Sequence, residues 1–241
     1  LYAAGAKIGR IASRNVENAR KLADAVGAEA VEISRIDGAD ADIVIIAVHD
    51  DAISTIVNAV TPAGHAIFTH TAGSVPMSVF DPGRFPRHGI FYPMQTMSKT
   101  LDVDWRTAPM FIEGSSPEVE NELMAAARLL SDNVSRLDSD HRAQLHAAAV
   151  ICCNMAMYLW SQADSVLSDA GLDFEVMRPL LEVTLDRTRS LRPAEAMTGP
   201  ARRGDLRTIR RHLASLPPEV EPTYRILSEA ILAKYHPELS L

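Results

Sequence analysis

The stretch KIGRIASRN, from Lys7 to Asn15, has the pattern of a short strand followed by the start of a helix. The strand is expected to end near Ser13, and Asn15 is a favoured N-cap residue. Apolar residues then recur three and four positions apart until Gly27, which is a favoured helix end. Because the preceding LYAAG has the character of a last helical turn, we expect this strand to be the second of a parallel sheet covered by helices.

Six further strand-like runs alternate with helical periodicity through the first half of the chain. The run DIVIIAVHDD, beginning at Asp42, predicts a strand buried on both faces at the centre of the sheet. Asp50 or Asp51 can cap the next helix, and Ser116 with Pro117 can open another. The six expected strands are residues 30–32, 42–49, 65–69, 89–92, 109–113 and 133–137.

Strand signals stop near Asp138, and helical periodicity continues to the end of the chain. The sequence therefore predicts an α/β Rossmann-like domain, doubly wound around a mostly parallel sheet, over residues 1–137, and an all-α domain over residues 138–241. The first helix of the second domain is expected over residues 139–170. Its centre, LHAAAVICCNMAMYLW, is apolar nearly all round, which predicts burial partly against another subunit of a homodimer. Further helices are expected over residues 174–190, 205–215 and 219–234, separated by the loop MTGPARRGD.

The composition restricts the class of partner. The chain has 241 residues, 47% of them hydrophobic, and a net charge of −7, which argues against nucleic acid or an anionic membrane as the main partner. We expect no membrane span, because no apolar run approaches about 18 residues, and no signal peptide, and hence a cytoplasmic protein with a small-molecule substrate. Cys152 and Cys153 are adjacent in an apolar stretch, so neither a disulfide framework nor a metal site is expected.

The turn formed by Ser13, Arg14 and Asn15 bears on the choice of cofactor. In a Rossmann unit, a glycine-rich turn after the first strand holds the pyrophosphate of a dinucleotide. That strand and its glycine turn are absent from this sequence, which starts with Leu1, so we expect the native protein to continue upstream. After the second strand, an acidic residue is typical of NAD enzymes, whereas basic and hydroxyl groups suit the 2′-phosphate of NADP. The turn favours NADP, and the alternative is a helix cap beside a solvated arginine.

Four stretches carry a resemblance to a known family: HTAGSVPMSVF, GIFYPMQTMSK, HRAQLHAAAVICCN and TGPARRGD. Together they resemble a family assigned as NADP-dependent oxidoreductases, in which a Rossmann-like domain is joined to a helical domain of unknown function. Its fold is similar to that of pyrroline-carboxylate reductase and of the hydroxyisobutyrate and phosphogluconate dehydrogenases. The resemblance implies a cofactor at the sheet's C-terminal edge and a substrate site against the helical domain.

The resemblance also implies roles for two turns. Ala47, Val48 and His49 end the strand where those relatives pass the cofactor's ribose. Thr71, Ala72, Gly73 and Ser74 resemble the turn that lies beside the nicotinamide in pyrroline-carboxylate reductases. Gly73 permits close backbone approach there, and Ser74 offers a hydroxyl group. The alternative for the second turn is a tight connection in which Gly73 supplies unusual backbone dihedrals and Pro76 starts a short helix.

Histidine is the candidate proton donor, because imidazole titrates near neutral pH. His70 and His146 are both available, and His146 has the stronger case because Ser139, Arg142 and His146 share one stripe of a helix. Asn154 lies about 80° round the helix from His146 at 3.6 residues per turn and is expected to orient the substrate. The predicted catalytic set is His146, Asn154 and Ser74.

Two loops supply predicted substrate-binding residues, and each also reads equally well as a structural connector. The first is QTMSK, with Gln95 and Lys99, and the second is TGPARRGD, with Thr198, Gly199 and Arg203 positioned for a ligand carboxylate.

Two functions remain open from the sequence. The first is an NADP-dependent oxidoreductase acting on a small carbonyl, imine or hydroxy acid. The second is a non-catalytic dinucleotide sensor or partner protein, because Val150 occupies the position at which hydroxyisobutyrate-type dehydrogenases carry a lysine.

Overall fold

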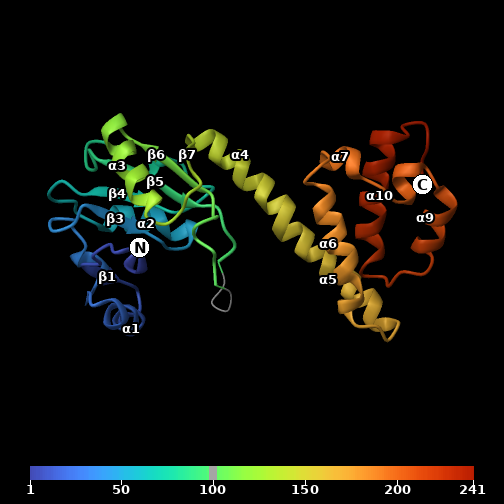
Figure 1. Cartoon of the computed structure of the whole chain (residues 1–241), viewed down its shortest axis with the longest axis horizontal. Helices are drawn as coiled ribbons and strands as arrows, with labels where there is room; N and C mark the ends of the chain where they lie inside the picture. Colours follow the sequence, from blue (N-terminus) through green and yellow to red (C-terminus); the bar gives the residue numbers. More distant parts are fainter. Residues whose placement is uncertain (98–101) are drawn as a thin grey trace. The chain divides into compact units, whose positions relative to one another are not determined.

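The computed structural model describes residues 1–97 and 102–241, and it divides into two compact units, Leu1–Val150 and Ile151–Leu241. The first unit contains β-strands and helices, and the second is helical, as Figure 1 shows. This agrees with the predicted Rossmann-like domain followed by an all-α region. The domain boundary predicted from the sequence lies after residue 137, just before helix α4 (Ser139–Ala149). In the structure, α4 belongs to the first unit.

Each of the seven expected strands has a counterpart in the first unit. They are β1 (Arg10–Ala12), β2 (Glu29–Val31), β3 (Ile43–Ile46), β4 (Ile67–His70), β5 (His88–Pro93), β6 (Met110–Gly114) and β7 (Val134–Arg136). β1 and β2 form a parallel two-stranded sheet, and the other five form a sheet in the order β3-β4-β5-β6-β7. Every neighbouring pair is parallel except β5 and β6. The sheet is therefore mostly parallel, as predicted.

The predicted central position of the DIVIIAVHDD strand is wrong for the five-stranded sheet. In the described residues β3 pairs only with β4 and forms an edge, whereas β5 is the middle strand. The physical reason is that a continuous apolar run reports burial of both faces of a strand and not the pairing of both its edges. Ile46 is buried, and the three strand residues before it are half-buried.

The helices of the first unit begin close to the expected residues. They are α1 (Val16–Val26), α2 (Asp50–Ala59), α3 (Pro117–Arg128) and α4, with short 3-10 turns at Tyr2–Ala4, Ile33–Arg35 and Met77–Val79. The side chains of Asn15 and Ser116 accept N-cap hydrogen bonds from Glu17 N and Val119 N, and Gly27 ends α1 with φ of 68°. His49, rather than Asp50 or Asp51, is the N-cap residue of α2, and both aspartates lie in its first turn.

Helices α2 and α3 contribute to two separate apolar clusters of the five-stranded sheet. Phe68 of β4 packs with Ile53 and Val57 of α2, whereas the adjacent Ile67 packs with Leu123 of α3. Successive residues of a strand point to opposite faces, so this alternation shows that both faces of β4 are covered. The arrangement is the doubly wound layering that the sequence predicts.

The second unit begins inside a long helix. This helix runs from Ser139 to Asp169, which confirms the helix predicted over 139–170, and its centre is a π-helical segment, η4 (Val150–Met155), between α4 and α5 (Ala156–Asp169). The remaining helices follow the expected order and include two short ones within the predicted loop region. They are η5 (Phe174–Met177), α6 (Arg178–Arg187), α7 (Pro193–Ala196), α8 (Pro200–Arg203), α9 (Leu206–Leu213) and α10 (Glu221–Tyr235).

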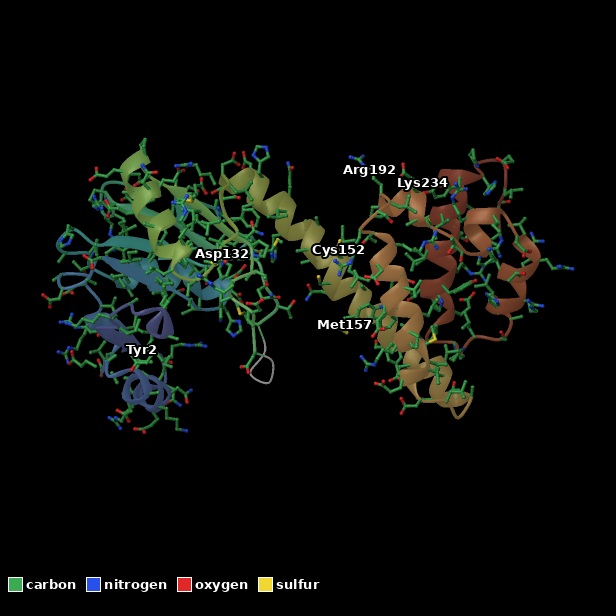
Figure 2. All side chains as sticks on the ribbon, in the orientation of Figure 1. Tyr2, Asp132, Cys152, Met157, Arg192 and Lys234 are labelled. Carbon is green, nitrogen blue, oxygen red and sulfur yellow. The ribbon has the colours of Figure 1, made fainter. Side chains whose placement is uncertain are left out.

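The long apolar helix is open to solvent within the single chain. No residue of η4 or α5 is buried, and Cys152 and Met157, labelled in Figure 2, are both exposed. The sequence predicts no apolar run as long as a membrane span. This prediction is wrong for Ser139–Asp169, because this helix is long and apolar enough to cross a membrane, judged by length and composition alone. A single helix of this kind is weak evidence for a span, because core helices of soluble proteins pass the same test.

Candidate functional site

The candidate site lies at the edge of the sheet where β4 and β5 both end. These strands are parallel neighbours, with His70 of β4 opposite Ile90 of β5. Their carboxyl ends therefore meet at one edge, which is where ligands bind in open α/β sheets. The turn Thr71–Ser74 follows β4, and Tyr92 lies in the last residues of β5.

Gly73 is the point at which three elements converge. It is buried, and a Cβ added to it would lie 2.5 Å from Nδ1 of His146 and 2.9 Å from Cζ of Tyr92. Real Cβ contacts are longer, so any larger residue would push α4 or β5 away. The requirement for glycine here is the close approach of two side chains to its backbone. The predicted approach of the cofactor to this turn stays a prediction.

His146 projects from α4 against this turn and is half-buried. Its Nδ1 lies 3.3 Å from the hydroxyl oxygen of Tyr92, and the two rings meet edge to face with centroids 6.3 Å apart. Nε2 of His146 has no hydrogen-bond partner in the described residues and is not among their buried polar atoms. The imidazole therefore has one nitrogen held by Tyr92 and the other open to solvent.

A buried ion pair fixes the first turns of α4 against the sheet. Arg142 is fully buried, and its guanidinium donates to Glu113 of β6 at 2.7 Å and to the carbonyl of Val75 at 2.5 Å. Ser139 donates to the same carboxylate at 2.7 Å and accepts from the backbone N–H of Met77 at 2.9 Å. The predicted stripe of Ser139, Arg142 and His146 therefore faces the sheet edge, and its first two members hold the third in place.

His70 is buried in an aromatic cluster and is not a suitable proton donor. Its Nδ1 accepts a hydrogen bond from the backbone N–H of Ala72 at 3.2 Å, and its ring stacks on Phe80. Burial lowers the pKa of His70 to about 4, and the charge of Arg142 acts in the same direction. The imidazole is neutral at pH 7, and its role is to shape the turn that contains Gly73.

The two turns predicted to contact the cofactor are connected by a hydrogen bond. Ser74 donates to the carboxylate of Asp50, in the first turn of α2, at 2.5 Å. Asp50 follows Ala47, Val48 and His49, which are all exposed after β3. The predicted cofactor-binding turns after β3 and β4 are therefore adjacent at the sheet edge.

The turn after β1 has the donors that a 2′-phosphate requires. Asn15 uses its side-chain oxygen to cap α1, which leaves its amide N–H groups free. Ser13 accepts from the backbone N–H of Asn15 at 3.4 Å and retains its hydroxyl hydrogen. Arg14 is exposed and forms no ion pair with the residues that the structure describes. Hydroxyl, guanidinium and amide donors at the start of an 11-residue helix fit a phosphate group.

The other predicted site residues lie in the second unit, in a loop after β5 or outside the described residues. Asn154 lies in the π-helical segment of the second unit, where the rotation expected from 3.6 residues per turn does not apply. Thr198, Gly199 and Arg203 are also in the second unit, where Gly199 has φ of 103° and precedes α8. Gln95 is exposed in the loop after β5, and Lys99 lies outside the described residues.

Sequence reasoning missed two members of the site, Tyr92 and Glu113. Each is a polar residue near the end of an otherwise apolar strand, FYP in β5 and FIEG in β6. That contrast is the signal that could have identified them, because strand ends are where side chains leave the core. Asp50 was interpreted only as a helix cap, and its hydrogen bond to Ser74 joins it to the site.

Comparison with known proteins assigns both halves of the chain. Residues 1–73 match the family described as "NADP oxidoreductase coenzyme F420-dependent", and residues 108–231 match "Domain of unknown function (DUF2520)". A crystal structure of a candidate NADP oxidoreductase from Bacteroides fragilis is similar at 38% identity and a TM-score of 0.84, covering 95% of this chain and 90% of that one. The chain belongs to this family of NADP oxidoreductases. NADP is the cofactor of the family, as the sequence predicts.

Two further solved structures share the fold of this NADP oxidoreductase family member at lower identity. A protein from Thermotoga maritima is 22% identical, with a TM-score of 0.72, and the match covers 98% of this chain and 94% of that one. An imine reductase from Myxococcus stipitatus in complex with NADP+ is 13% identical, with a TM-score of 0.68, over 97% and 89% of the two chains. A comparison with curated proteins found no match.

Proposed function

We propose that the protein is an NADP-dependent oxidoreductase that reduces or oxidises a small carbonyl, imine or hydroxy-acid metabolite. The observation that carries the proposal is the contact of His146 with Gly73, because it places a titratable side chain beside the turn predicted to lie at the nicotinamide. The fold shared with an imine reductase supports a C=N or C=O substrate by analogy of fold.

Some of the chain's residues bind the cofactor, and another transfers the proton. Ser13, Arg14 and Asn15 hold the 2′-phosphate, while the backbone of residues 47–49 and 71–73 borders the rest of the cofactor. When bound, NADP supplies or accepts the hydride. His146 donates or accepts the accompanying proton at Nε2, the nitrogen open to solvent. Ser74 completes the polar set on the cofactor side.

The second unit contributes the predicted substrate contacts. Asn154 orients the substrate, and Thr198, Gly199 and Arg203 bind it through a hydroxyl group, a backbone N–H and a positive charge, together with Gln95 and Lys99 of the first half. Arg203 is exposed and forms no ion pair with the described residues. A free guanidinium near a glycine of positive φ suits a substrate that carries a carboxylate.

The alternative function is a dinucleotide sensor that has kept the fold and lost the chemistry. It is favoured by Val150, which stands where hydroxyisobutyrate-type dehydrogenases carry lysine. Following NADPH fluorescence against a panel of small oxo acids, imines and aldehydes separates the two. Turnover of any member at enzyme-like rates excludes the sensor.

We further propose that the protein acts as a cytoplasmic homodimer. The support is the solvent-exposed apolar surface of α5, where Met157, Tyr158 and Trp160 are 59%, 54% and 38% exposed in the single chain. Contiguous apolar patches of this kind mark interaction sites in soluble proteins. A second copy of the same surface is a self-complementary cover for it.

Titration calorimetry of the full-length protein tests the cofactor. NADPH should bind more tightly than NADH, and Arg14→Asp should weaken NADPH binding by roughly 10- to 100-fold, since a charge-assisted hydrogen bond contributes about 1.5–3 kcal/mol. Binding of NADH should change little. Arg20→Asp is the control, because Arg20 is an exposed arginine of α1, the helix that follows Arg14, and it pairs with Glu17. Equal losses for both cofactors, or no binding at all, would overturn the assignment.

A further inference from the structure

The environment of His146 gives its two ring nitrogens different roles. Nδ1 lies 3.3 Å from the hydroxyl oxygen of Tyr92, and Nε2 is open to solvent. A histidine that exchanges a proton with substrate works from one nitrogen, and the bond made by the other nitrogen decides which one it is. The side chain that bonds Nδ1 therefore controls the chemistry at Nε2.

We propose that Tyr92 is a positioning residue that selects the tautomer of His146, its hydroxyl oxygen accepting a hydrogen bond from Nδ1–H so that Nε2 is the proton-exchanging nitrogen. This inference deepens the proposed oxidoreductase function and rests on it for its catalytic part. The tautomer itself is a property of the protein alone.

The tyrosine is held rigidly enough for this role. It is 7% exposed, and its ring lies beside that of Phe111, its register partner on β6, with 6.4 Å between centroids and 30° between ring planes. Gly73 lies against both Tyr92 and His146, which leaves no room for either ring to move toward the turn. Side chains fixed by packing hold a hydrogen bond at lower entropic cost than mobile ones.

Burial keeps the tyrosine neutral. Burial raises the pKa of Tyr92, and Asp50 acts in the same direction, while Arg142 opposes them. Arg142 precedes His146 by one helical turn and is itself paired with Glu113. A neutral phenol offers lone pairs to an N–H donor. Among the described residues, the imidazole contacts the Tyr92 side chain and the Gly73 backbone.

The proton balance is simple. The imidazolium carries protons on both nitrogens, and the proton on Nε2 passes to the substrate oxygen or nitrogen that receives it. The ring is then neutral and keeps its remaining proton on Nδ1, still donated to Tyr92. Solvent returns a proton to Nε2 for the next cycle, and the tyrosine neither gains nor loses one.

A second tyrosine–histidine pair offers a matched control. In the second unit, Nδ1 of His212 lies 2.7 Å from the hydroxyl of Tyr224, and their rings also meet edge to face. Tyr224→Phe removes the hydroxyl group of a half-buried tyrosine that bonds a histidine, and Tyr92→Phe removes that of a buried one at the candidate site. Neither residue of this second pair belongs to the proposed cofactor or substrate contacts.

The test is nitrogen NMR of the full-length protein labelled with ¹⁵N-histidine, without cofactor and at a pH where the imidazole is neutral. His146, assigned by its loss in His146→Asn, should show a protonated Nδ1 and a bare Nε2. In Tyr92→Phe it should shift toward the Nε2–H form that free histidine prefers, whereas Tyr224→Phe should leave His146 unchanged. A wild-type His146 in the Nε2–H form, or a tautomer unaffected by Tyr92→Phe, would overturn the proposal.

Kinetics give an independent second arm. On any substrate found by screening, Tyr92→Phe should lower kcat by about tenfold, the fold-change expected for one hydrogen bond, with NADPH affinity unchanged. An unchanged kcat would overturn the catalytic part of the inference. If the wild-type protein turns over no substrate, the oxidoreductase function fails, while the NMR result still decides the tautomer.

Discussion

The two units of the chain differ in how completely they bury their apolar side chains. In the first, both faces of the sheet are covered, and Ile53, Ile67 and Ile90 are completely buried. In the second, the buried cluster is small, centred on Ile209 and Leu232, while most large apolar side chains of α5 and α6 remain exposed. The first unit buries both faces of its five-stranded sheet, whereas the second leaves many large apolar side chains exposed, as surfaces that bind partners do.

The largest loss of stability is expected for Glu113→Leu, which tests whether the first unit depends on its buried ion pair. The substitution leaves Arg142 buried without its carboxylate, which should cost about 3–5 kcal/mol of stability. Hydrogen exchange should show the loss in β6 and α4, and little change in α9 of the second unit. The double variant Glu113→Leu with Arg142→Met should recover most of it, because a buried pair replaced by apolar groups is often neutral. A loss below about 1 kcal/mol in the single variant would mean that the pair does not anchor α4.

The second prediction concerns the stability of the first unit at acidic pH. His70 has a folded pKa of about 4 and an unfolded value near 6.5, so between these limits the unfolded chain binds a proton that the folded unit excludes. The contribution of His70 is fully present above pH 6.5 and is lost as pH falls toward 4, by at most about 3 kcal/mol. Chemical unfolding of wild type and His70→Asn across this range measures it, with Asn chosen to keep an acceptor for Ala72 N–H. Parallel pH profiles for the two proteins would refute the assignment.

The third prediction compares two tryptophans, one in each unit, whose side chains are similarly exposed. Trp160 of α5 is 38% exposed and Trp105 of the first unit is 36% exposed. If the α5 surface pairs with a second copy, Trp160→Ala should weaken dimerisation by about 2 kcal/mol or more, a typical value for a central aromatic contact. Trp105→Ala should leave it unchanged. Sedimentation of both variants decides this, and a monomeric wild-type protein at micromolar concentration would remove the dimer.

The sequence predicted elements more reliably than their partners. Local signals placed all seven strands and the caps at Asn15 and Ser116, because alternation and capping act over a few residues. The position of β3 in the sheet depends on pairing between strands that are distant in sequence, which no short window contains.

The candidate site shows the same limit. Helical spacing grouped Ser139, Arg142 and His146 correctly, since they lie on one element. Tyr92 and Glu113 come from strands about 30 to 50 residues away in sequence, and only the sheet register brings them to α4. The residues assigned to the second unit, Asn154 and Arg203 among them, remain predictions.

The most direct test of the account is the activity of His146→Asn beside that of the wild-type protein. NADPH oxidation would be followed with the panel of oxo acids, imines and aldehydes, and NADPH affinity would be measured on the same samples. The account predicts that the wild type turns over at least one substrate and that His146→Asn lowers this turnover by about 100-fold or more, with cofactor affinity nearly unchanged, as expected for loss of a general acid. Full activity in the folded variant would show that His146 only packs against Gly73, and would contradict the central claim.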